Sequence, residues 1–149
     1  ASNIATLTGA AAEINTAYAS SGISNLGDEA VTLTDTSLTA TVLNTLDGRT
    51  SGTINANSIN TLSGTAADLN TAYASSGISG LGNEAVTLSD STLTASVLNT
   101  LDGNTSGAIN AGSINGLAGT WQEELQGEGD ARRYEPSQLH AVCSLSSLP

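Results

Sequence analysis

The sequence contains two nearly identical copies of one long segment, one directly after the other. Residues 6–60 align with residues 61–115, and 13 of the 55 aligned positions differ, mostly by exchanges such as Thr for Ser or Asp for Glu. The register also extends backwards, because Ile4 matches Ile59. Such self-similarity is typical of proteins in which one structural unit stacks on copies of itself. We therefore expect the chain to be a piece of a longer array and to begin in the middle of a repeat.

Each repeat contains two related halves. The tripeptide Ile/Leu-Asn-Thr occurs four times at similar intervals, beginning at Ile14, Leu43, Leu69 and Leu98. Every occurrence lies downstream of a Thr-Leu-Thr or Thr-Leu-Ser triplet. The elementary unit is therefore about 27 residues long, which is within the range of strand-and-helix repeat units. The longer half carries an insertion.

Strand and helix patterns alternate within these units. Val31–Leu33 and Val86–Leu88 alternate apolar residues with Thr, which is the period of a half-buried strand. The apolar residues that follow have the spacing of one helix face: Leu38, Val42, Leu43 and Leu46 in the first repeat, and Leu93, Val97, Leu98 and Leu101 in the second.

Polar residues and glycines predict the ends of these helices. Asp35 and Asp90 are placed to cap the starts, and Gly48 and Gly103 to supply a left-handed residue after the ends. In the other half, Thr65 and Asp68 have the spacing of a capping box, and Gly77 is placed to close that helix. Thr8 is the candidate cap of the equivalent helix in the first repeat, where Ala10 replaces Thr65.

We predict an α/β fold: a β/α solenoid with a parallel sheet on one face and short helices on the other, each coil being about 27 residues long. Strand-plus-helix units of similar length occur in leucine-rich repeats. A narrow coil has room for Leu, Val, Ile and Ala only, which agrees with the absence of Phe and Met. An all-β solenoid is the alternative, because Thr, Ser and Asn are poor helix formers and the helices would be short.

The repeat stops after Thr120, which predicts two regions. Residues 1–120 form a repeat array with two 55-residue repeats plus partial repeats. Residues 121–149 contain the only Trp, His and Cys and both Pro, so we interpret them as a C-terminal cap or a foreign tail.

The charge balance excludes several classes of partner. The chain has 14 acidic residues against 3 Arg and no Lys, with a net charge of −11. So few cations cannot neutralise a phosphate backbone, and we expect no nucleic-acid partner. We also expect no membrane insertion, because no run approaches the roughly 18 apolar residues of a membrane span. The first residues have neither the basic nor the apolar region of a signal peptide.

The repeat sequence resembles that of a known class of proteins. Three of its segments are similar to tandem repeats of very large, acidic cell-surface or secreted proteins of marine cyanobacteria and other bacteria. These segments are LNTLDGNTSG, LNTAYASSGISGLGNEAVTLSD and TLSGTAADLN. The resemblance covers Ala1 to about Thr120 and leaves the tail unmatched. It implies an extracellular, adhesin-like role in which repeats build length, and it implies no catalytic residue.

No residue set predicts catalysis, so we expect a protein that is not an enzyme. His140 is the only histidine, and no Gly-x-Ser-x-Gly motif surrounds a serine. Asp28 and Glu29 are adjacent carboxylates, but the second repeat has Asn83 before Glu84, which favours turn or surface charge.

We predict no cofactor and no metal site. The single cysteine excludes a cysteine-based site, and the loop motifs of common calcium sites are absent. Calcium stays an alternative, because acidic repeat proteins often bind it.

Four hydroxyl residues are candidates for a repetitive ligand surface. Thr32, Thr34, Thr87 and Ser89 are expected to point outward from stacked strands in regular files, which would suit ice or crystalline polysaccharide. Thr is also a good strand former, so the same residues are expected in a sheet without a ligand.

The function expected from these features is that of a spacer, stalk or filament body of an extracellular bacterial surface protein. Its partners would be neighbouring repeats of the same protein, together with end-to-end self-association through open strand edges. The alternative is a binding module that uses a Thr/Ser/Asn face for glycan, ice or mineral.

Overall fold

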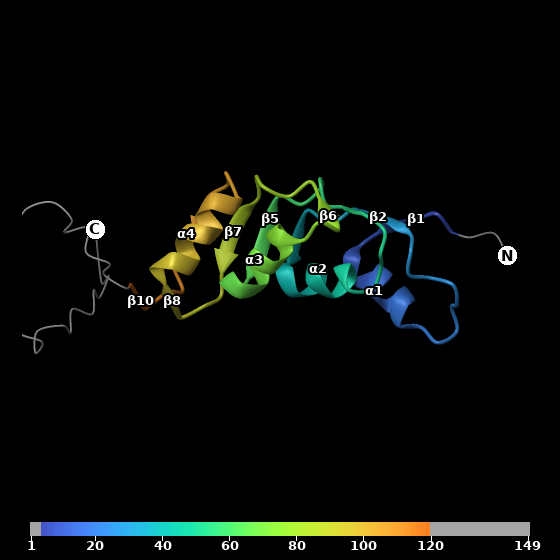
Figure 1. The fold of residues 1–149 in the computed structure, drawn as a ribbon, viewed down its shortest axis with the longest axis horizontal. Coiled ribbons are helices and arrows are strands. Elements are labelled where there is room, and N and C mark those ends of the chain that lie inside the picture. Colours follow the sequence, from blue (N-terminus) through green and yellow to red (C-terminus); the bar gives the residue numbers. More distant parts are fainter. Residues whose placement is uncertain (1–3, 120–149) are drawn as a thin grey trace, which may run out of the picture.

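The computed structural model describes residues 4–119, which form an elongated mixed α/β structure (Figure 1). The helices are α1 (Ala11–Ala19), α2 (Ala40–Asp47), α3 (Ala66–Ala74) and α4 (Ala95–Asn104). The strands are β1 (Thr6–Gly9), β2 (Ala30–Leu33), β3 (Ser37–Thr39), β4 (Ile54–Asn55), β5 (Thr61–Gly64), β6 (Ile78–Ser79), β7 (Ala85–Leu88), β8 (Thr92–Thr94), β9 (Ile109–Asn110) and β10 (Gly116–Ala118). The predicted boundary after Thr120 and the tail at 121–149 lie outside the described residues.

Every strand pair in this part of the chain is parallel, which confirms an α/β structure with parallel sheets. The prediction of one parallel sheet is wrong, because the strands are divided among three sheets. Two sheets have four strands, in the orders β1-β2-β4-β6 and β3-β5-β7-β9, and the third is the pair β8 and β10.

The step between paired strands is shorter than the predicted coil. Leu7 pairs with Val31, and Val31 in turn pairs with Ile54. Two such steps fall short of the full sequence repeat, because they end at β4, and the strand equivalent to β1 is the following strand, β5. The Thr-Leu-Thr triplet at Thr32 lies in β2, which leads into β3 without a helix between them. Alternation alone could not distinguish it from Ser37–Thr39, which directly precedes α2.

The inward-facing residues of the strands form the core of the molecule. Leu62 is fully buried between Leu38 and Val86, its partners on the two neighbouring strands. Leu43 and Leu69 of the helices are also fully buried. The fully buried apolar side chains among the described residues are Ala, Val, Ile and Leu, and Tyr18 and Tyr73 pack against them.

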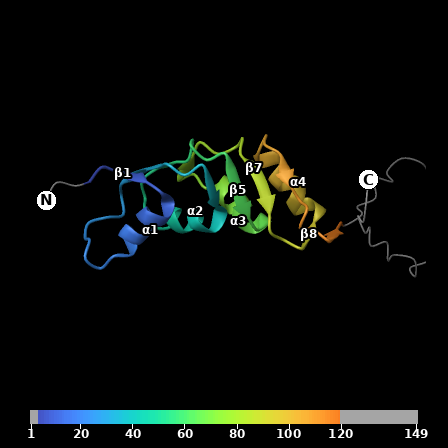
Figure 2. The ribbon, with the colours of Figure 1, turned by 180° about the vertical axis from the view of Figure 1, so that it is seen from behind.

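The helices lie side by side in chain order along the long axis, and each contacts the next (Figures 1 and 2). Their starts differ from the predicted ones. Leu38 belongs to β3, so α2 begins at Ala40, where the hydroxyl of Thr39 accepts a hydrogen bond from the Val42 N–H at 3.4 Å. The capping role of Thr65 is confirmed, because its hydroxyl accepts a hydrogen bond from the Asp68 N–H at 3.1 Å.

Two aspartates cap helices of the neighbouring half-repeat instead of their own. The Asp35 carboxylate accepts a hydrogen bond at 2.8 Å from the Ala11 N–H at the start of α1, and Asp90 accepts one at 2.7 Å from the Ala66 N–H at the start of α3. Asp35 therefore takes the place predicted for Thr8, since the N-cap Ala10 has no side-chain oxygen.

Gly48 directly follows α2 as predicted, but its φ of −71° is right-handed and not left-handed. The other two glycine predictions are wrong, because Gly103 lies inside α4 and α3 ends at Ala74, before Gly77 is reached. No left-handed residue is required, because the chain leaves these helices in right-handed or extended conformations.

Candidate functional site

The four candidate hydroxyl residues do not form one continuous file. Thr32 lies in β2 of the first sheet, whereas Thr87 lies in β7 of the second. Thr34 and Ser89 follow these strands, and each donates its backbone N–H to a glycine carbonyl of the preceding coil, Gly9 at 3.1 Å and Gly64 at 3.0 Å. The structure therefore places the candidates in two separate sets.

Each set belongs to a file of outward-facing polar residues, which we call a polar file. The members are paired residues of neighbouring strands: Thr8, Thr32, Asn55 and Ser79 in the first file, and Thr39, Ser63, Thr87 and Asn110 in the second. Asn55 and Asn110 interrupt the hydroxyl files.

Half of the polar-file side chains are already engaged within the protein. The side-chain oxygens of Asn55 and Asn110 accept hydrogen bonds from backbone N–H groups two residues later, at 3.1 and 3.0 Å. Ser79 donates to the Ile54 carbonyl at 3.1 Å, and Thr39 caps α2. These groups hold turns, strands and a helix start together, so they are not free to order a ligand.

A second polar feature was missed by the sequence reasoning. Glu29 and Glu84, equivalent residues of the two repeats, are both 0% exposed. One carboxylate oxygen of Glu29 accepts hydrogen bonds from the Tyr18 hydroxyl at 3.0 Å and from the Gly27 N–H at 2.8 Å. The same arrangement recurs in the second repeat, as the equivalent contacts show: Tyr73 hydroxyl to Glu84 at 3.1 Å and Gly82 N–H to Glu84 at 2.8 Å. We call each set a glutamate cluster.

A Thr-Ser-Gly turn from the next coil completes each cluster. The Thr50 hydroxyl donates to the Glu29 carbonyl at 2.8 Å and accepts the Gly52 N–H at 3.0 Å. Ser51 donates its backbone N–H to the Gly27 carbonyl at 2.8 Å. Thr105, Ser106 and Gly107 make the same contacts with Glu84 and Gly82. The turn therefore fastens one coil onto the preceding one.

The environment of Glu29 keeps its carboxyl group ionised. Burial alone would raise the pKa of Glu29, but hydrogen bonds from the backbone of Gly27, Asp28 and Glu29 and from the Tyr18 hydroxyl outweigh it, so the pKa lies below the usual 4.5. Burial also raises the pKa of Tyr73 to about 12, with a further contribution from the Glu84 charge. These tyrosines therefore stay protonated as donors at neutral pH.

The glutamate clusters are built to hold structure. Their carboxylates are fully buried, so a substrate in solution does not reach them. One oxygen of Glu29 and the side-chain oxygen of Asn15 are buried without a hydrogen-bond partner among the described residues. Asp28, adjacent to Glu29, is exposed, so the two neighbouring carboxylates lie in different environments. His140 lies outside the described residues.

A third set of polar side chains joins neighbouring helices. Asn15 donates to the Val42 carbonyl at 3.2 Å, and Asn44 donates to the Asp68 carbonyl at 2.9 Å. Thr41 donates to the Asp68 carboxylate at 3.1 Å, and Ser75 donates to the Asp47 carboxylate at 2.8 Å. The Asn of the repeated Leu-Asn-Thr tripeptide therefore acts between helices.

The described residues provide a shallow depression and no cluster of metal-ligating side chains. Residues 4–119 contain no group of three or more His, Cys, Asp or Glu that could hold a metal ion. A shallow, open depression lies beside the end of α3, lined by Asp47, Asn70, Thr71, Ala74, Ser75 and Ser76. No helix in the described part of the chain has the length and apolar character needed to cross a membrane.

Comparison with known proteins gives no relative from which residues or roles could be transferred. No family model matches the chain, and the searches of curated proteins and of solved structures also give no match.

Proposed function

We propose that this chain is a non-enzymatic structural segment, a β/α solenoid that serves as a spacer, stalk or filament body of an extracellular bacterial surface protein. One observation carries this proposal: polar side chains of each coil form hydrogen bonds with the neighbouring coil. The Thr-Ser-Gly turns, the cross-coil aspartate caps and the interhelix Asn and Ser bonds all join residues 21 to 28 positions apart. Coupling between nearest neighbours is the defining property of repeat proteins.

The mechanism of such a spacer is geometric. Every added 55-residue repeat contributes two helices and their strands to the row. The rise per repeat would be roughly 10 Å if the strand spacing sets it and roughly 20 Å if the helix spacing sets it. Tens of repeats would carry a terminal domain hundreds of ångströms from a surface.

The charge supports a soluble fibre, and the resemblance of the repeat sequences supports an extracellular position. The net charge of −11 makes neighbouring fibres repel one another, which favours solubility. The resemblance of the repeats to those of large bacterial surface proteins points to the same location. We infer no cofactor for this role.

The experiment is a length series. Chains with one, two and three additional copies of residues 61–115, inserted after Asn115, would be measured by small-angle X-ray scattering. The proposal predicts that the maximum dimension grows by the same increment, about 10–20 Å, with each inserted repeat. Growth that falls away with each insertion, as in a compact globule, would contradict it.

The binding-module alternative has weaker support, because half of the polar-file residues are engaged internally. Thr8, Thr32, Ser63 and Thr87 make no side-chain hydrogen bond with the described residues, so they are the ones to test. Glycan arrays and an ice-recrystallisation assay on the full chain, with Thr32→Ala/Thr87→Ala as the comparison, separate the two functions. Binding that this variant loses would favour the alternative.

A further inference from the structure

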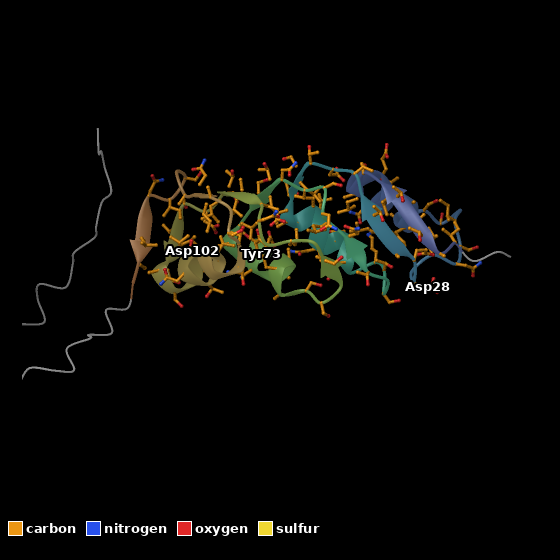
Figure 3. All side chains as sticks on the ribbon, turned by 90° about the horizontal axis from the view of Figure 1, so that it is seen from above. Asp28, Tyr73 and Asp102 are labelled. Atoms are coloured by element: carbon orange, nitrogen blue, oxygen red, sulfur yellow. The ribbon has the colours of Figure 1, made fainter. Side chains whose placement is uncertain are left out.

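The chain advances along the long axis of the molecule, one coil after another. Asp28 before β2, Tyr73 of α3 and Asp102 of α4 follow one another along this axis in the order of the sequence (Figure 3). Paired strands such as β1 and β2 belong to successive coils, so the hydrogen bonds between them join one coil to the next. A pull along the array therefore loads the junctions between coils in series. Each junction then carries the same force, and the weakest one opens first.

The junction inside each repeat is held by buried and partly buried polar contacts. In the first repeat, the Thr50 hydroxyl donates to the Glu29 carbonyl in a buried hydrogen bond, and the Asp35 carboxylate caps α1. The second repeat has the equivalent contacts. Strands β1 and β2 pair over four residues, as β5 and β7 do, and β2 and β4 pair over two. The two coils of one repeat are therefore fastened through their interior.

The junction between the two repeats depends on polar contacts that lie nearer the surface. Thr41 donates to the Asp68 carboxylate in an exposed hydrogen bond, and the bonds from Asn44 to Asp68 and from Ser75 to Asp47 are only partly buried. Strands β3 and β5 pair over three residues and β4 and β6 over two. Water can replace an exposed hydrogen bond as soon as it opens, so such a bond resists separation less than a buried one.

The apolar core does not distinguish the two kinds of junction. Leu62 is fully buried, and its strand partners are Leu38 across the junction between repeats and Val86 across the junction inside the second repeat. Aliphatic side chains therefore cover both sides of the same coil. The difference in strength comes from the polar contacts and from the length of strand pairing, and both favour the junction inside the repeat.

We propose that the array is an extensible tether that opens under tension at the junctions between repeats and releases one whole repeat at a time. This inference rests on the proposed stalk role. A repeat that loses its neighbour also loses the contacts that cover its core, so it unravels once the junction has opened. A folded repeat contributes about 10–20 Å, whereas its 55 residues span about 180–200 Å when extended. Each opened repeat would lengthen the stalk while the remaining repeats stay folded.

The test is stretching of single molecules with optical tweezers. The full chain with three additional copies of residues 61–115, inserted after Asn115, would be held by tags at its two ends. The proposal predicts successive steps that each add about 160–190 Å of contour length, which is the extended length of one repeat minus its folded length. The steps should reverse when the force is lowered, because folded neighbours remain for the released repeat to pack on.

Two sets of substitutions in this chain distinguish the junctions. Asn44→Ala, with Asn99→Ala in every later repeat, removes a hydrogen bond between helices of successive repeats. Ser51→Ala, with Ser106→Ala in every later repeat, is the matched control, because it removes an exposed hydrogen bond between the coils of one repeat. At constant force, the asparagine variant should open about fivefold faster than the parent, as expected for the loss of one hydrogen bond, and the serine variant should open like the parent.

Three results would overturn the inference. Steps of about 80 Å, the span of one extended coil, would show that single coils open separately. One step that releases the whole array would show that no junction is weaker than the others. Faster opening of the serine variant than of the asparagine variant would place the weak junction inside the repeats. Any of these results, combined with constant growth in the scattering series, would reject the tether and leave the stalk role standing.

Discussion

At the residue scale, each Thr-Ser-Gly turn depends on a glycine whose missing side chain admits a backbone carbonyl. A Cβ at Gly52 would collide with the Glu29 carbonyl, and a Cβ at Gly107 would collide with the Glu84 carbonyl. The Thr50 and Thr105 hydroxyls bond to those same carbonyls. A close approach of two coils therefore fixes the residue type at these positions.

Gly107→Ala should lower the free energy of unfolding by about 1–3 kcal/mol, because the neighbouring backbone cannot move without losing the Thr105 bond. Gly103→Ala, in the last turn of α4, should raise it by about 0.5–1 kcal/mol, because alanine favours a helix and the site is open. Urea unfolding of both variants measures the difference. Equal effects of the two substitutions would contradict the described turn.

The buried Glu29 makes stability depend on pH. Its pKa is lower in the folded chain than the usual 4.5, so its contribution is complete above pH 4.5 and is lost as the pH falls through the folded value. The thermal midpoint of the parent chain should therefore decrease on acidification below about pH 4.5.

Glu29→Gln should lower the free energy of unfolding at pH 7 by about 1–3 kcal/mol, because it leaves a buried amide without an acceptor. The loss should shrink as the pH falls through the folded pKa of Glu29, because the parent carboxyl then becomes protonated as well. Calorimetry of both chains over a descending pH series tests this, and a loss that grows on acidification would contradict the ionised, buried Glu29.

At the element scale, helices are started by residues of another coil. Asp35 lies far along the chain from Ala11, yet its carboxylate holds the first N–H of α1. The sequence pattern correctly indicated that this aspartate caps a helix, but it assigned the nearest helix. Sequence spacing cannot show which of two stacked helix starts a side chain reaches, because that depends on the register of the sheets.

Asp35→Ala should therefore destabilise α1 by about 0.5–2 kcal/mol and leave the start of α2 protected. Amide hydrogen exchange resolved by residue is the measurement, with faster exchange expected at Ala11 and its neighbours. Asp102→Asn is the control, because the Asp102 side chain is exposed and makes no hydrogen bond with the described residues. Faster exchange confined to α2 would contradict the cross-coil cap.

The asparagines at equivalent positions of α2 and α4 allow a second pair of matched substitutions. Asn44→Ala should lower the free energy of unfolding by about 1 kcal/mol, because it removes the donor to the Asp68 carbonyl. Asn99→Ala, at the equivalent position of α4, should change it little, since the Asn99 side chain is exposed and makes no hydrogen bond with a described residue. Thermal unfolding at low protein concentration compares them, and equal losses would contradict a role between helices.

The strands and helices were predictable to different degrees. The alternating Val31–Leu33 pattern and the apolar helix face identified β2 and α2, and the parallel arrangement followed from the repeat. The number of sheets could not be predicted, because it depends on the spacing along the chain between paired strands. That spacing is shorter than half of the sequence repeat, so the repeat length does not reveal it. The buried Glu29 was also missed, since a glutamate beside Asp28 and Gly27 reads as a surface turn.

At the scale of the whole molecule, stability should be a property of neighbouring coils and not of single repeats. The core runs along the row without interruption, from Ile14 of α1 to Leu101 of α4. The same continuous packing would produce a long spacer from many repeats.

Equilibrium urea unfolding of the length series tests this account most directly. If neighbouring coils support one another, each added copy of residues 61–115 should raise the unfolding midpoint, with the largest gain for the first addition, and should increase the slope of the transition. If the repeats instead fold as independent lobes, the midpoint will stay constant however many are added, and that result would contradict the account.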